Sequence, residues 1–166
     1  VADEPVIKRF GLRMEARTLR VTRRDYFFEK PRLLMEGAHT PQDDLPQPDL
    51  EDYDYPGRFK ADASGQPFTE VRLQALRNDA STAAGDSNRP DFRAGAKVTL
   101  TDHDIEALNR DWLLTAVTHT GTQPQALEEE GGSEPTSYHN QFTAIPADRP
   151  WRPQTPHRPL MDGPQM

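Results

Sequence analysis

Residues 112–120 read WLLTAVTHT and carry the strongest strand pattern in the chain. Their alternate positions form two faces, and both faces hold apolar side chains: Trp112 and Leu114 on one, Leu113 and Val117 on the other. Apolar residues on both faces predict an inner strand that is covered on two sides. Strand patterns continue on either side of this segment, so we expect a mainly β fold.

The neighbouring strands are predicted from the same kind of pattern. A solvated hairpin loop at Thr122–Ser137 leads to a return strand at Tyr138–Ile145, and a turn at Arg93–Gly95 precedes a strand at Lys97–Leu100. The first third of the chain, residues 1–37, is expected to hold two or three further strands and a short fourth one. They cover Val6–Leu12, Thr18–Thr22, Asp25–Phe28 and Leu33–Met35.

One helix is predicted, within residues 61–84. Leu73, Leu76 and Ala80 follow each other at positions i, i+3 and i+7, which is helical spacing. Pro67 suits the first turn of a helix and Gly85 suits a stop after its last turn. The fold is therefore expected to be α+β, with a single helix among the strands.

The chain has sixteen prolines and ten glycines among 166 residues, and many of the prolines lie in two stretches. Residues 38–60 alternate prolines with acidic residues, and residues 147–166 carry a proline every few positions. Neither stretch holds enough apolar surface to order itself by packing, so both are expected to be extended arms. Trp151 and Arg152 begin the second arm, and an aromatic residue there is expected to anchor the arm on a neighbouring surface.

The composition excludes several classes of function. Lys and Arg number 20 against 27 Asp and Glu, which gives a net charge of −7 and argues against duplex nucleic acid as a partner. The absence of cysteine rules out disulfides, zinc fingers and thiol catalysis. We find no apolar run long enough to span a bilayer and no signal-like start, and the lack of an initiator Met suggests a piece of a longer protein.

No constellation of residues predicts an enzyme, a metal site or a cofactor. The sequence has no nucleophile elbow, P-loop or dinucleotide fingerprint, and its carboxylates cluster in proline- and glycine-rich loops, where exposed groups make poor general acids. His103, between Asp102 and Asp104, has the appearance of a metal ligand, but a turn after the preceding strand explains it better. His119 and His139 are expected to be packed cross-strand neighbours.

Seven motifs in consistent order resemble the VgrG family, the spike proteins of bacterial type VI secretion systems, which are related to phage tail hubs and late-control D proteins. These motifs cover nearly the whole chain. They are DYFFEKP at 25–31, YDYPGRF at 53–59, RLQALR at 72–77, an expected turn with Gly85, Ser87 and Asn88, RAGAKVTLTDH at 93–103, LNRDWLLTAVTHTG at 108–121 and YHNQFTAIPADRPWRP at 138–153.

The resemblance implies a structural role without catalysis. Family members are trimers whose hub-like region has two β-barrel tube domains per subunit and docks on the Hcp tube. An OB-fold and a needle tipped by a PAAR protein follow, and effectors are carried with the spike. The particle would be assembled in the bacterial cytoplasm and then secreted into the medium or a target cell.

On this basis the chain is expected to be the later part of the hub-like region. The expected organisation is strands of that region at 1–37, an acidic linker at 38–60, the helix at 61–84, a small β-barrel tube-type domain at 85–146, and a linker toward an OB-fold at 147–166. The candidate interface residues are Tyr53, Tyr55, Phe59, Trp151 and Arg152. The least self-supported segments should be Ala38–Pro56 and Trp151–Met166.

Two alternatives stay open. The runner-up within the same class is the baseplate hub of a contractile phage tail or a related particle, and neighbouring genes for sheath and Hcp-like proteins or for capsid proteins would separate the two. A different class is a spike-linked hydrolase. Hydrolysis that is abolished by substituting Asp102 or Asp104 would support the hydrolase, and we expect none.

Overall fold

The computed structural model describes residues 4–41, 49–60, 62–124, 135–153 and 163. The chain divides into two compact units. Unit 1 comprises Val1–Arg17, Pro46–Pro48 and Asp79–Pro150, and unit 2 comprises Thr18–Leu45, Asp49–Asn78 and Trp151–Met166. Among the described residues, no helix has the length and apolar character needed to cross a membrane.

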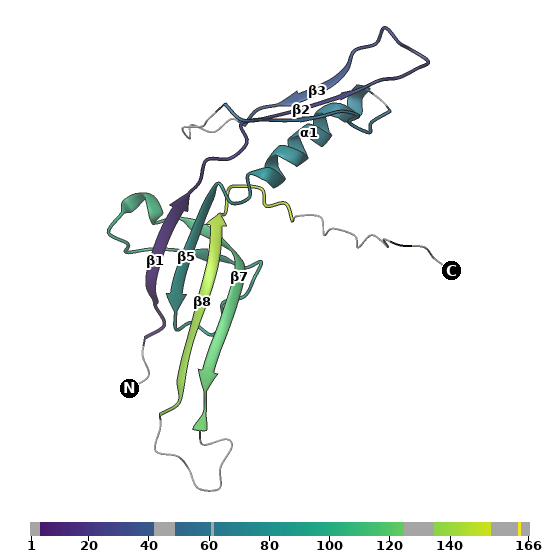
Figure 1. The fold of residues 1–166 in the computed structure, drawn as a ribbon. Helices are drawn as coiled ribbons and strands as arrows, with labels where there is room; N and C mark the ends of the chain where they lie inside the picture. Colours follow the sequence, from purple (N-terminus) through teal and green to yellow (C-terminus); the bar gives the residue numbers. More distant parts are fainter. Residues whose placement is uncertain (1–3, 42–48, 61, 125–134, 154–162, 164–166) are drawn as a thin grey trace. The chain divides into compact units, whose positions relative to one another are not determined.

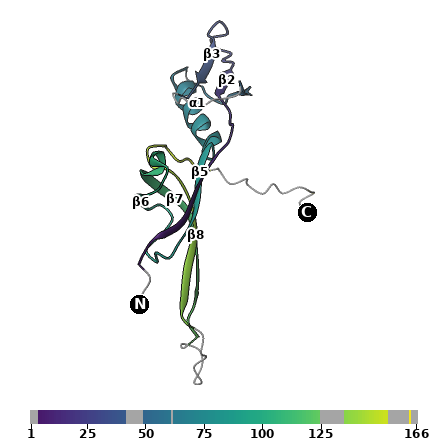
Figure 2. The same cartoon turned by 90° about the vertical axis from the view of Figure 1, so that its left-hand side faces the viewer.

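Unit 1 is built on one antiparallel sheet of five strands (Figure 1). Across the sheet the strands follow the order β1, β5, β8, β7, β6, which are Ile7–Met14, Ser81–Ser87, Ser137–Pro146, Asp111–Thr122 and Lys97–Thr99. The view in Figure 2 shows β5 and β8 edge-on with β6 to one side of them, so the sheet curls into a half-barrel. The predicted strands around Lys97, Trp112 and Tyr138 are confirmed.

The concave side of this sheet holds the core of unit 1. Trp112 is 1% exposed, and its indole nitrogen donates to the Leu108 carbonyl at 3.0 Å, at the end of the short 3-10 helix Glu106–Leu108. The Phe10 ring meets the Trp112 ring edge-on at 4.9 Å between centroids. The buried cluster around them is Ala83, Phe92, Leu100, Leu108, Trp112, Leu114, Phe142 and Ala144.

Strand β7 changes faces along its length. Leu114 pairs with Ala144 and Ala116 with Thr143, which leaves Thr115 as an extra residue in β7. A bulge of one residue shifts the alternation, so Val117 packs on the same core as Leu114. β7 has a hydrogen-bonded neighbour on each side, β8 and β6. From Ala116 to its end, however, the strand is largely exposed to solvent, so the expected burial of both faces is wrong.

Unit 2 pairs a three-stranded sheet with the helix. β2, Arg20–Asp25, lies between β3, Met35–His39, which is antiparallel to it, and β4, Glu51–Asp54, which is parallel. Helix α1, Asp62–Leu76, packs on this sheet and approaches β3 so closely that a Cβ on Gly37 would stand 2.5 Å from the Gly65 carbonyl carbon.

The helix is confirmed, but its predicted end is wrong. It stops at Leu76, and residues 81–87 form strand β5. Ala80 is buried just before that strand, and Gly85 lies within it, where the Cα partners are Phe10 in β1 and Phe142 in β8. Pro67 also lies inside the helix and not in its first turn. The apolar spacing was misleading because Ala80 belongs to unit 1, whereas the helix belongs to unit 2.

Residues 38–60 are more ordered than an extended arm. β3 continues to His39, and β4 forms within the acidic stretch, although residues 42–48 lie outside the described residues. In the described part of this stretch, a strand ladder and polar contacts order β4, and the buried Phe59 side chain anchors the loop after it. Leu19 and Arg20 both donate to the Leu50 carbonyl, at 2.8 and 3.1 Å, and Thr22 donates to Glu51 at 2.5 Å.

The strands of residues 1–37 divide between the two sheets. β1 joins the five-stranded sheet beside β5, whereas β2 and β3 belong to unit 2. Residues 26–34 form turns instead of the strand expected at Asp25–Phe28, with Lys30 donating to the Phe27 carbonyl at 3.0 Å. The mainly β fold is confirmed, with one α-helix in the part of the chain that the structure describes, and the expected domain boundaries stay a prediction.

Candidate assembly surfaces

The predicted interface residues lie in different environments. Tyr53 and Tyr55 are 54% and 59% exposed, and Trp151 is 44% exposed. Phe59 is only 3% exposed, so it is not a surface anchor in unit 2. Its ring packs close to the backbone of Gly57 and Gly65, and its backbone nitrogen donates to the Asp25 carboxylate at 3.1 Å. Phe59 is therefore a core residue of unit 2.

The Trp151–Arg152 segment is attached to helix α1 and the turn that follows it. The Arg152 guanidinium donates to the Gln74 side chain at 2.8 Å. The Arg152 backbone nitrogen donates to Asn78 Oδ1 at 2.9 Å, and the Asn78 amide donates back to the Arg152 carbonyl. These polar contacts hold the backbone while the Trp151 side chain stays half exposed, and most of the following segment, 154–166, lies outside the described residues.

The histidines have local structural partners. His103 lies in a turn, where its backbone nitrogen donates to Asn109 at 2.8 Å and its ring accepts from the Ile105 nitrogen at 3.0 Å. His119 pairs with Asn140 and not with His139, which pairs with Thr120. The expected pairing of His119 with His139 is thus wrong, because the strand register is shifted by one residue from the one that would place them opposite each other. Within the described ranges, no three His, Asp or Glu side chains gather as metal ligands would.

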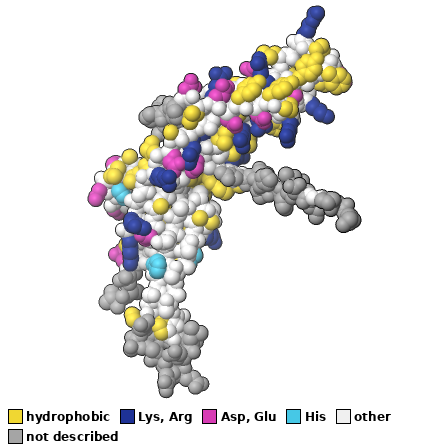
Figure 3. Space-filling model, in the orientation of Figure 1, with side chains coloured by type: hydrophobic (Ala, Val, Ile, Leu, Met, Phe, Trp, Pro, Cys, Tyr) yellow, Lys and Arg dark blue, Asp and Glu magenta, His cyan; other side chains and the backbone are white. Residues whose placement is uncertain are grey.

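A cluster of exposed apolar side chains covers the turns between β2 and β3 (Figure 3). Phe28 is 76% exposed and Leu34 is 66% exposed, and Tyr26 and Leu33 accompany them. Phe28 stacks edge-on with Phe27 at 5.9 Å between centroids. Exposed apolar clusters of this kind are typical of surfaces that contact proteins, membranes or ligands.

A wide groove lies between the two ends of the half-barrel. About 1180 Å³ in volume, it is lined by residues 4–7 at the start of β1 and by residues 89–93 and 96–102 around β6. β1 and β6 are the two edges of the sheet in the described part of the chain. Unpaired strand edges can accept a further strand, so this groove is suited to contact with additional polypeptide.

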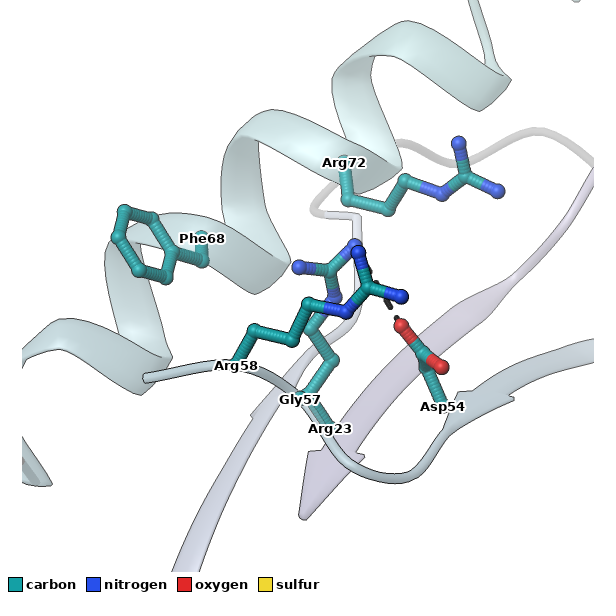
Figure 4. Close-up of a pocket in the computed structure, with 6 residues that line it drawn as sticks. All are labelled: Arg23, Asp54, Gly57, Arg58, Phe68 and Arg72. Atoms are coloured by element: carbon teal, nitrogen blue, oxygen red, sulfur yellow. Dashed lines mark ion pairs between the residues drawn. The ribbon is translucent and has the colours of Figure 1, made fainter. Parts of the chain in front are cut away.

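A second pocket, of about 490 Å³, lies in unit 2 between the sheet and helix α1. Figure 4 shows three arginines from three elements around it: Arg23 from β2, Arg58 from the loop after β4 and Arg72 from α1. The parallel pairing of β2 with β4 places Asp54 beside Arg23, with 3.9 Å between the Arg23 guanidinium and the carboxylate. Phe68 forms part of the rim.

Sequence reasoning missed this arginine pocket. Its members stand far apart in the sequence, at 23, 58 and 72, and only the parallel β2–β4 pairing and the packing of α1 bring them together. Part of the signal was present, because Arg58 lies in the YDYPGRF motif at 53–59, where only the aromatic residues were considered.

Open strand edges, exposed aromatic residues and an open arginine pocket define a β-rich building block with surfaces for protein contacts. The family comparison agrees with this class. A model of the phage tail baseplate hub (GPD) family matches residues 1–125. The chain therefore belongs to the phage tail baseplate hub (GPD) family.

Individual relatives extend the match to nearly the whole chain. The type VI secretion system spike protein VgrG5 of Pseudomonas aeruginosa is 45% identical over 98% of this chain, and the actin cross-linking toxin VgrG1 of Vibrio cholerae is 41% identical over 99% of it. The chain spans only 22% and 15% of those two proteins. The resemblance to VgrG proteins is thus confirmed for a part of their length.

A solved structure supports the fold. The 43 kDa tail protein of prophage MuSo2 from Shewanella oneidensis superposes with a TM-score of 0.56, over 84% of this chain and 40% of that protein. The sequences are 11% identical, so this likeness concerns the fold alone.

Proposed function

We propose that this chain is a structural part of the hub-like region in the spike of a type VI secretion system. The similarity to VgrG spike proteins along almost all of the chain carries the proposal, and the curled five-stranded sheet supports it. In this role the chain contributes surfaces and rigid sheets, and its own residues perform no catalysis.

The assembled particle that we propose is a homotrimer that docks on an Hcp tube. A PAAR tip and effectors would associate through other regions of the polypeptide, and the particle would be assembled in the cytoplasm and then secreted. Within this chain, residues 85–146 would belong to a tube-type domain and residues 147–166 would lead toward an OB-fold. Tyr53, Tyr55, Trp151 and Arg152 remain the proposed interface residues, because the structure leaves the three aromatic side chains half exposed.

The complete polypeptide that contains this sequence tests the proposal. Its mass in solution, measured by light scattering after size exclusion, should be three times the mass of one chain. A strictly monomeric complete polypeptide would contradict a trimeric spike. The 166-residue chain alone is not expected to trimerise, since other regions would supply much of the association energy.

A contractile phage baseplate hub is the second candidate. It is favoured by the family match and by the fold of the prophage tail protein. Neighbouring genes for sheath and Hcp-like proteins would support the secretion spike, and capsid genes would support the phage hub. A spike-linked hydrolase would instead show hydrolysis that is lost on Asp102→Asn or Asp104→Asn, and we expect no such activity.

A further inference from the structure

The arginine pocket of unit 2 holds more cations than its own carboxylate can neutralise. Arg72 pairs with Asp52 at 3.0 Å, beside the pocket. Arg23 lies 3.9 Å from Asp54, which is beyond hydrogen-bonding distance, and its Nε is buried without a hydrogen-bond partner among the described residues. A buried donor without a partner lowers the stability of the folded state. An acceptor group bound in the pocket would remove this cost.

Arg58 reaches this pocket from a constrained loop. Its φ is +60°, a left-handed conformation that residues other than glycine rarely adopt. Hydrogen bonds from backbone nitrogens hold the loop in place on both sides of Arg58, because the Gly57 nitrogen donates to the Arg24 carbonyl at 2.8 Å and the Phe59 nitrogen donates to the Asp25 carboxylate at 3.1 Å. Within the described residues no hydrogen bond or ion pair engages the Arg58 guanidinium, so it is free to bind a ligand.

The ligand that fits two available guanidiniums is an oxyanion, and a carboxylate matches the planar guanidinium fork. A polyanion such as nucleic acid is disfavoured by the chain's net charge of −7, which repels it as a whole. A single short acidic segment feels less of this repulsion because only its side chains enter the pocket.

The rim of the pocket favours a protein as the source of the carboxylate. Phe68 and Val71, three residues apart on α1, are each 46% exposed beside Arg72. Aromatic residues and arginines together are typical of protein interfaces. The chain itself carries the acidic run Glu128–Glu130, so a second copy of the chain brings carboxylates that match the arginines of the pocket.

We propose that the arginine pocket binds an acidic segment of a second copy of this chain, with Arg58 and Arg23 donating to its carboxylates. This proposal rests on the proposed function, in which copies of the chain associate. Asp54 then acts as an internal competitor for Arg23 until the acidic segment enters.

The first experiment titrates the 166-residue chain with the acetylated peptide Glu-Glu-Glu, which has the sequence of residues 128–130, and follows binding by NMR at low salt. Arg58→Gln should weaken binding by up to about fivefold, as expected for one exposed charge pair. The matched control is Arg32→Gln, an exposed arginine of the same unit outside the pocket, which should leave binding unchanged.

A second variant is expected to raise the affinity for the peptide. Asp54→Asn removes the competing carboxylate and should strengthen peptide binding by about two- to fivefold. Damage to the fold cannot produce a gain in affinity, so this variant keeps the test valid even if Arg58→Gln lowers stability. No gain with Asp54→Asn, or equal losses with Arg58→Gln and Arg32→Gln, would overturn the site.

Two further measurements identify the source of the carboxylate. Inorganic phosphate that binds as tightly as the peptide would overturn the assignment to a protein segment. In the complete polypeptide, Arg58→Gln should raise the dissociation constant for self-association, and an unchanged constant would overturn the second copy as occupant. A monomeric wild-type polypeptide would instead disprove the proposed function, while the peptide titration would still decide whether the pocket binds carboxylates.

Discussion

At the scale of single residues, Gly85 shows how closely the strands of unit 1 pack. It lies in β5 between β1 and β8, and a Cβ there would stand 2.4 Å from the Arg9 carbonyl oxygen and 2.5 Å from the Phe142 ring. The oxygen belongs to the backbone of the neighbouring strand, so it cannot move without disturbing the β1–β5 ladder.

Gly85→Ala should therefore lower the free energy of unfolding by about 1–3 kcal/mol, the usual cost of overpacking. Gly11→Ala is the matched control, because Gly11 lies in the paired strand β1 and a Cβ there meets no atom within 4 Å. The control should change stability by less than about 1 kcal/mol. Chemical denaturation of both variants measures the difference, and equal effects would refute the close packing at Gly85.

Gly85 also illustrates what the sequence leaves undecided. A glycine after an apolar helical pattern suits a helix stop, and the same residue suits a point of close strand packing. Residue type does not distinguish the two, because the distinction depends on Phe142, which is 57 positions away in the sequence. Trp112 was easier to predict as a core residue because its own strand pattern is strong, and the structure confirms its burial.

At the scale of elements, an ion pair joins the segment after β1 to the segment before β5. The Arg17 guanidinium donates to both Asp79 oxygens, at 2.7 and 2.6 Å, and the Arg17 side chain also contacts Glu15. The hydrogen bond from Arg17 lowers the pKa of Asp79, although burial opposes the shift. A lowered pKa means that the pair stabilises the folded state above the usual aspartate pKa of about 4.

Asp79→Asn should cost up to about 1 kcal/mol near neutral pH, because both side chains are partly exposed to solvent. The difference from wild type should shrink as the pH falls through the lowered pKa of Asp79, since the wild-type carboxylate is then protonated. Unfolding curves at several pH values measure this. Asp91→Asn is the comparison variant, because Arg89, two residues away, also lowers the pKa of Asp91. So local a pair can persist in the unfolded chain, and its loss should therefore change the free energy of unfolding less than the loss of the Arg17–Asp79 pair.

Elements were predicted well where local pattern and tertiary packing agree, as in β6, β7 and β8. β4 was missed because its residues, EDYD, are poor strand formers that are ordered by the ladder with β2 and by the Arg72–Asp52 pair. The bulge at Thr115 was missed because strict alternation was assumed. The arginine pocket needed the pairing of distant strands, which no local pattern indicates.

At the scale of the whole molecule, each unit has a buried cluster of its own. Trp112 and Phe142 belong to the core of unit 1, and Val21, Met35 and Leu73 are buried in unit 2. Separate cores favour separate cooperative openings.

Amide hydrogen exchange of the 166-residue chain should therefore show two groups of protected amides with different opening free energies. Gly85→Ala should accelerate exchange in β5 and β8 while amides of β2 keep their wild-type rates, and Gly11→Ala should alter neither group. Uniform acceleration of all protected amides would show a single cooperative unit. Ladder amides of β2 and β4 should be protected, although the sequence alone predicts that Ala38–Pro56 is among the least self-supported segments.

The hairpin of β7 and β8 continues past its last neighbouring strand. β5 pairs with β8 only as far as Asn140, whereas β7 pairs with β8 out to Thr122 and Ser137. Because no third strand among the described residues pairs with these outer positions, the ribbon can gain or lose one residue on each strand and keep its register. Length changes in homologous proteins should accumulate here as matched pairs, which would let the reach of the hairpin evolve without any change to the half-barrel that supports it.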